Sequence, residues 1–153
     1  MGDFHQNGII TTLHNLGERS LADMEHELSG FSSVRPLGLI LPSLYSELEG
    51  QAMPKILSEL KNVPYLNQIV VGLDRADLNQ YQAALSFFSE LPQHHRVLWN
   101  DGPRLRAIDK KLSDLDLAPK ELGKGRNVWY CMGYILASNK AESVALHDCD
   151  ITT

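Results

Sequence analysis

Short apolar runs alternate with longer amphipathic stretches along most of this chain, and this alternation constrains the fold more than any other feature. The runs are rich in Leu, Ile and Val, which is typical of strands buried on both faces of a sheet. Expected strands are residues 37–42, 66–74, 96–100 and 142–148. Expected helices between them are residues 47–62, 77–91, 103–117 and 123–139. This order predicts an α/β fold, with a mostly parallel sheet of about four strands, right-handed crossovers and helices on both faces.

The start of the chain has a different pattern. Apolar residues recur at helical spacing through residues 11–29, and Gly30 is a plausible stop for this helix. The stretch "SGFSS" is then expected to be a hinge. We therefore expect an N-terminal helical arm at residues 1–33, followed by the α/β domain at residues 34–153.

Composition excludes several classes of protein. A chain of 153 residues suits one domain, and a net charge of −5 argues against a nucleic-acid binder, which needs a basic face. No apolar run approaches the roughly 20 residues that cross a bilayer, and the first residues lack the pattern of a secretory signal. Two cysteines are too few for a disulfide framework. We expect a cytoplasmic protein with reduced thiols and no membrane or nucleic-acid partner.

The predicted topology selects the place for a binding site. In open parallel sheets, ligands bind beyond the carboxyl ends of the strands. The segments that follow the expected strands are "PSLYSE", "DRAD", "NDG" and "DCD". We therefore expect the residues of a binding site to lie in these four segments.

Two acids close the last expected strand. In an extended backbone Asp148 and Asp150 project to the same side, while His147 and Cys149 point the other way. Like charges this close repel, and Mg²⁺, which is often held by one or two carboxylates plus phosphate and water, relieves the conflict. The alternatives are a solvated acidic turn, or a zinc site through His147 and Cys149, for which further ligands are lacking nearby.

A second candidate is the basic segment "LGKGRNVWY" at the start of an expected helix. Lys124 lies between Gly123 and Gly125, and Arg126 follows. Cations are unfavourable at a helix N-terminus, whereas exposed N–H groups, two glycines and an ammonium together suit a phosphate. The alternative is a basic loop that faces solvent.

The ends of the first two expected strands offer polar groups to a nucleoside. Pro42 and Ser43 form a stiff turn with exposed backbone, and Asp74 can accept hydrogen bonds from a ribose or a base, or serve only as a turn residue. Neither a G-x-G-x-x-G fingerprint nor a phosphate-binding P-loop follows the first strand, which excludes the two commonest nucleotide-binding motifs. Base, phosphate and metal candidates nevertheless converge on one sheet edge, as a nucleoside diphosphate requires.

Four segments, in this order, resemble the nucleotide-binding half of GT-A fold glycosyltransferases of the family-2-like group. They are "LPSLYSE", "IVVGLD", "GKGRNVWYCMGYILAS" and "VALHDCDI", and within that group they are most similar to glucosyl-3-phosphoglycerate and mannosyl-3-phosphoglycerate synthases. The resemblance covers about residues 35–152. It implies a Rossmann-like sheet and the transfer of a hexose from a UDP- or GDP-linked donor to a small phosphorylated or carboxylate acceptor such as 3-phosphoglycerate.

The resemblance also implies roles for individual residues. It assigns the base contact to the backbone of Pro42, Ser43 and Leu44. Tyr45 and Ser46 stand where the family has Asn-Glu and are followed by Glu47, so a further base contact falls to either Ser46 or Glu47. By the same resemblance the nucleoside contact falls to Asp74, the diphosphate contact to Lys124, and Mg²⁺ or Mn²⁺ to Asp148 and Asp150, with Asp150 as the direct ligand.

One departure from the family concerns catalysis. The family has a comparable length after its D-x-D motif, which supplies the acceptor pocket, so we expect a donor-binding half in which no catalytic residue is identifiable. The alternative from another class is a non-catalytic nucleotide-binding module that pairs with another chain, and a homo-oligomer also stays open. A nucleotidyltransferase is disfavoured, because "PSLYSE" is neither glycine-rich nor basic.

Overall fold

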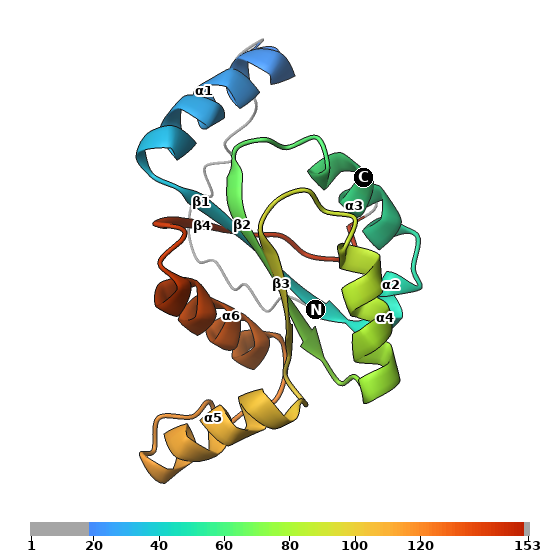
Figure 1. Ribbon diagram of the computed structural model, residues 1–153, viewed down its shortest axis with the longest axis vertical. Coiled ribbons are helices and arrows are strands. Elements are labelled where there is room, and N and C mark those ends of the chain that lie inside the picture. Colours follow the sequence, from blue (N-terminus) through green and yellow to red (C-terminus); the bar gives the residue numbers. More distant parts are fainter. Residues whose placement is uncertain (1–18, 152–153) are drawn as a thin grey trace, which may run out of the picture.

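The computed structural model describes residues 19–151 and confirms the α/β class. Its strands form one parallel sheet in the order β3-β2-β1-β4 (Figure 1). The strands are β1 (Leu37–Leu44), β2 (Leu66–Asp74), β3 (His95–Trp99) and β4 (Ser143–Leu146). The helices are α1 (Leu21–Val34), α2 (Tyr45–Leu48), α3 (Ala52–Leu60), α4 (Leu78–Phe88), α5 (Pro103–Asp114) and α6 (Lys124–Ser138).

The two faces of the sheet are covered by different helices. Side chains alternate along a strand, so Ile69, Val71 and Leu73 of β2 enter one core while Val70 enters the other. The larger core also holds residues of α3 and α4, and the smaller one joins Val70 to Ile135 and neighbouring residues of α6. Figure 1 shows α6 on one side of the sheet and α2, α3 and α4 on the other, as the sequence predicted.

The residues at the N-termini of α4, α5 and α6 explain why these helices begin where they do. Asp77 is the N-cap of α4: its carboxylate accepts from the Gln80 N–H, and the Gln80 side chain accepts from the Asp77 N–H in return. Pro103 opens α5, where its missing N–H has no helical partner to lose. The α6 helix starts after Gly123, whose φ of 138° suits glycine, and no side chain caps it.

Some sequence predictions were wrong. The helix expected at 47–62 is divided into α2 and α3, with Pro54 in the first turn of α3. Gly30 does not end the first helix and "SGFSS" is not a hinge, since α1 runs on to Val34; residues 11–18 of the expected helix lie outside the described part. Ser32 explains the longer helix, because its buried hydroxyl bonds the Tyr65 carbonyl at 2.6 Å and the Asn67 side chain at 2.7 Å.

The fourth strand is shorter than expected. It ends at Leu146, and residues 149–150 form a turn instead of extended backbone. The prediction that extended backbone projects Asp148 and Asp150 to the same side is therefore wrong. Within residues 19–151, no helix is both long enough and apolar enough to cross a membrane.

Gly72 of β2 controls how closely α6 approaches the sheet. Asn127 donates a 2.7 Å hydrogen bond from its side chain to the Gly72 carbonyl. A Cβ on Gly72 would lie 1.7 Å from Asn127 Oδ1 and 2.6 Å from Cys131 Sγ. We predict that Gly72→Ala lowers the free energy of unfolding by about 2–3 kcal/mol, because the overpacked helix must shift away.

Urea denaturation measures this change, and Gly133→Ala is the matched control on α6. A Cβ on Gly133 meets nothing within 4 Å, so this variant is expected to gain up to about 1 kcal/mol from its higher helix propensity. Equal stability of the two variants would contradict the predicted close contact.

Candidate functional site

One cavity of about 240 Å³ lies at the carboxyl ends of β1 and β2. All of the residues that the sequence assigned to a site line it, together with several neighbours. They are Pro42, Ser43, Leu44, Glu47, Asp74, Lys124, Asp148 and Asp150, with Arg75, Gly123, Asn127 and Cys149 beside them. The structure thus brings together segments that are far apart in the sequence.

The end of β1 forms one wall of this cavity. Ser43 is buried, and its hydroxyl donates to the Leu44 carbonyl at 2.9 Å. The Leu44 N–H donates to Glu47 Oε2 at 2.9 Å. Glu47 therefore caps the first turn of α2 with one carboxylate oxygen, and the backbone of this wall is held in place by its own side chains.

The first turn of α6 forms the opposite wall. The first helical hydrogen bond of this turn runs from the Asn127 N–H to the Gly123 carbonyl, so the N–H groups of the residues between them have no partner within the helix. The Lys124 ammonium donates to Asp148 Oδ1 as an ion pair. Their side chains are 55% and 44% exposed, so water competes with this pair and its contribution to stability is below about 1 kcal/mol.

The two acids are suited to a hard cation. Asp150 is exposed, Asp148 is partly exposed, and both border the cavity. No group of three or more His, Cys, Asp or Glu side chains gathers anywhere in the part of the chain that the structure describes. Two carboxylates fit Mg²⁺ or Mn²⁺ with phosphate and water as the remaining ligands, but they do not fit the four protein ligands of structural zinc.

The cysteine between these acids has a structural role. Cys149 is 2% exposed and is buried in the larger core, which anchors the acidic turn against the sheet. Burial, followed by the nearby Glu47 charge, raises the pKa of its thiol to about 12. Structural zinc needs four ligands, and in residues 19–151 no third or fourth His, Cys, Asp or Glu side chain gathers with His147 and Cys149, so the zinc alternative does not fit this structure.

Arg126 is a site residue whose partner the sequence did not reveal. Asp74 is only 4% exposed, and its Oδ1 lies 3.5 Å from Arg126 Nη2 and accepts from Asn100 Nδ2 at 3.2 Å. A buried acid at a strand end requires a countercharge, and a cation in the first turn of a helix requires a nearby anion. These two unfavourable placements are the sequence signal from which the pairing of Asp74 with Arg126 could have been predicted.

Arg126 is itself supported by an aromatic residue. Its guanidinium carbon lies 5.9 Å from the centre of the Tyr130 ring, and the Tyr130 hydroxyl donates to Asp109 of α5. Burial and the Asp109 carboxylate raise the pKa of Tyr130 to about 12. Asp74 is thus held by a chain of contacts that reaches from β2 through α6 to α5.

Comparison with known proteins identifies relatives of the chain. No protein-family model matches it. It is 48% identical over 151 residues to a glucosyl-3-phosphoglycerate synthase of Persephonella marina, covering 99% of this chain and 38% of that protein. It is 36% identical over 156 residues to the enzyme of the same name from Methanococcoides burtonii, covering 99% of this chain and 37% of that protein. The chain is a homologue of glucosyl-3-phosphoglycerate synthases.

This homology confirms the resemblance seen in the motifs. The chain spans a little over a third of the length of these two relatives. A third match, to a neuferricin homolog of Caenorhabditis elegans, is 31% identical over 67 residues and covers 44% of this chain and 21% of that protein. That match covers too little of either protein to carry an argument about family.

The buried pair of Asp74 and Arg126 gives a stability prediction. Arg126→Met is expected to lower the free energy of unfolding by roughly 3 kcal/mol, because it leaves the Asp74 charge buried without its main partner. Asp74→Asn combined with Arg126→Met is expected to be more stable than Arg126→Met alone, since no charge is then uncompensated. Urea denaturation of Asp74→Asn, Arg126→Met and the double variant, each beside the parent chain, measures the coupling.

Arg104→Met is the control for loss of an arginine, because Arg104 is exposed on α5. Its free energy of unfolding is expected to stay within about 0.5 kcal/mol of the parent value. Strictly additive effects at Asp74 and Arg126 would contradict the pairing.

The two thiols predict how stability depends on pH. Burial raises the pKa of Cys131, like that of Cys149, to about 12, so folded thiols stay protonated where unfolded thiols, with a pKa of about 8.5, ionise. The unfolded state then binds fewer protons than the folded state. The free energy of unfolding is therefore expected to fall as the pH rises above about 8.5, by on the order of 1 kcal/mol per pH unit for each thiol.

Urea denaturation between pH 8 and 9.5 tests this dependence. Replacing both cysteines by alanine should flatten the slope, whatever it does to the stability at pH 8. Native thiols that react with a disulfide reagent as fast as urea-unfolded ones would contradict the burial on which the prediction rests.

Proposed function

We propose that this chain binds the nucleotide-sugar donor of a glycosyltransferase. The observation that carries the proposal is the cavity at the ends of β1 and β2, which is bordered by an acid pair, a lysine at a helix N-terminus and a buried strand-end acid. The donor is a UDP- or GDP-linked hexose. The acceptor of the whole protein is a small acid such as 3-phosphoglycerate, as the names of its two relatives suggest.

The diphosphate of the donor binds between Lys124 and the two acids. In the structure Lys124 is paired with Asp148, and both side chains are partly exposed. Asp150 and Asp148 would hold a divalent ion, which would supply Lewis-acid stabilisation of the diphosphate leaving group. Lys124 then exchanges Asp148 for a phosphate oxygen, and the free N–H groups of the first turn of α6 point toward the same negative charge.

The nucleoside lies across the ends of β1 and β2. The backbone of Pro42, Ser43 and Leu44 forms the wall beside the base, and it is fixed by the Ser43 and Glu47 hydrogen bonds. Asp74 offers a carboxylate that Arg126 and Asn100 hold in position. N–H or O–H groups of the base or ribose donate hydrogen bonds to this carboxylate.

A non-catalytic module that binds nucleotide and pairs with another chain is the second candidate. The favouring observation is β4, which lies at the edge of the sheet and leaves Val144 and Leu146 37% and 49% exposed. Such edges pair readily with another strand. This candidate predicts a stable oligomer in size-exclusion chromatography. Binding of the nucleotide-sugar donor by a single chain does not require an oligomer.

Calorimetric titration of the 153-residue chain with UDP-glucose and GDP-mannose, with and without Mn²⁺, tests the donor site. We expect Mn²⁺ to tighten binding of at least one of them by tenfold or more, which corresponds to about 1.4 kcal/mol. Asp150→Asn should remove this gain because it removes the direct metal ligand. Asp114→Asn, which changes an exposed acid on α5, should leave it intact. Folded protein that binds neither nucleotide sugar in the presence of Mn²⁺ would refute the proposal.

A further inference from the structure

The α1 helix has an apolar face that residues 19–151 leave uncovered. Its exposed apolar residues recur at i, i+3, i+7 and i+10, a spacing that places them in one stripe along the helix. Acidic residues flank this stripe, Glu25 on one side and Glu27 on the other. Glu27 is paired with Arg19 at 2.7 Å, but both side chains are about half exposed, so this pair opens at little cost. The stripe consists of Leu21, Met24, Leu28 and Phe31.

A groove of about 880 Å³ lies between β3, α5 and α6, and it is lined mainly by apolar side chains. The charged residues among those described as lining it are Arg96 and Arg104, both basic and both exposed. The α5 wall has an apolar face made of Leu105, Ile108 and Leu112, although no residue between Pro103 and Asp114 is buried. The groove is therefore an apolar surface with a basic rim.

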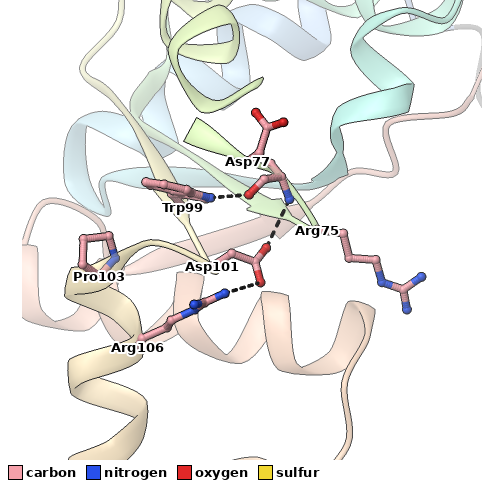
Figure 2. A pocket seen from close by; sticks show the side chains of 7 residues that line it. Arg75, Asp77, Trp99, Asp101, Pro103 and Arg106 are labelled. Carbon is pink, nitrogen blue, oxygen red and sulfur yellow. Dashed lines mark hydrogen bonds and ion pairs between the residues drawn. The ribbon is translucent and has the colours of Figure 1, made fainter. Parts of the chain in front are cut away.

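Several contacts fix the walls of this groove. Trp99 donates from Nε1 to a backbone carbonyl after β2 at 2.7 Å, and the Arg106 guanidinium lies 3.8 Å from the Asp101 carboxylate at the start of α5 (Figure 2). Farther along, the Tyr130 hydroxyl of α6 donates to Asp109 of α5. A groove whose walls are fixed before binding loses less conformational entropy when it is filled.

The stripe of α1 and the groove complement each other in polarity and in charge. An amphipathic helix binds an apolar groove through anchors at the spacing that the stripe has, and its acidic flanks suit a basic rim. Like charges disfavour pairing of either surface with itself. Figure 1 shows α1 and α5 at opposite ends of the molecule, so α1 does not reach the groove of its own chain. The occupant that fits is α1 of a second copy.

We propose that α1 of one chain binds in the groove between α5 and α6 of another. Because the two surfaces differ, the contact joins copies either head to tail or reciprocally in a dimer. The described residues that line the groove are all different from those that line the donor cavity, so this inference does not depend on the proposed function.

Two charge substitutions test the contact from its two sides. Phe31→Lys changes the stripe, where the residue is 62% exposed, and Ile108→Glu changes the groove, where it is 49% exposed. Sedimentation velocity of the parent is expected to show species larger than the 17.1 kDa monomer. Each variant should lose at least tenfold in association constant. Leu85→Lys, at an exposed apolar residue of α4 outside both surfaces, is the matched control and should associate as the parent does.

Mixing the two variants gives the sharpest measurement. Phe31→Lys keeps an intact groove and Ile108→Glu keeps an intact stripe, so one contact per pair is restored. The mixture should therefore form a 1:1 complex that neither variant forms alone. If circular dichroism shows that a variant is unfolded, Phe31→Ala and Ile108→Ala replace the pair, with the same expected direction.

Three results would overturn the inference. The first is a parent chain that stays monomeric at every concentration measured. The second is an oligomer that both variants retain, since it would use another surface such as the β4 edge. The third is a mixture that forms no complex, because like surfaces would then account for any association of the parent.

Discussion

The parallel pairing of β1 with β2 is the interaction on which the rest of the structure depends. Both strands are buried on both faces, and their register places Leu44 opposite Asp74, so they end at the same level. Their last residues therefore present backbone and carboxylate groups to one cavity. The α6 helix is fixed to the same pair by the Asn127 bond to the Gly72 carbonyl, which sets the height of its first turn and hence of Lys124.

Two ion pairs at this edge differ in how easily they open. The side chains of Arg126 and Asp74 are 15% and 6% exposed, so separating them would leave a charge with neither water nor partner. Lys124 and Asp148 are about half exposed, and water or another ion replaces either partner at little cost. The buried pair thus holds a binding group in position, whereas the exposed pair is able to exchange its partners for a metal and a phosphate.

The sequence predicted the strands well because apolar runs buried on two faces leave a strong pattern, and strand ends then located the site loops. It did not predict the order of the sheet, since nothing in the residues of β4 specifies β1 as its neighbour. The sequence named Arg126 only as part of a basic segment, because its partner Asp74 is distant in the chain. The left-handed φ of 55° at Arg75 was missed because Trp99 at the end of β3 and Asp101 in the following loop hold the neighbouring Ala76. Gly30 was wrongly predicted to end the first helix. The tertiary hydrogen bonds of Ser32, which the sequence does not reveal, hold the helix together beyond this glycine.

The residues of the proposed site differ in how firmly the fold holds them in position. The residues proposed to contact the nucleoside lie on β1 and β2, the most deeply buried strands, whereas the two acids follow β4, of which three residues are exposed. Cys149 compensates for this weak support, because its buried side chain anchors the acidic turn in the core while Asp148 and Asp150 face the cavity. In the proposed donor site, base recognition would therefore depend on rigid backbone, and metal binding would depend on a turn held by one buried side chain. A change in packing at Cys149 should consequently reach the metal ligands before it reaches Asp74.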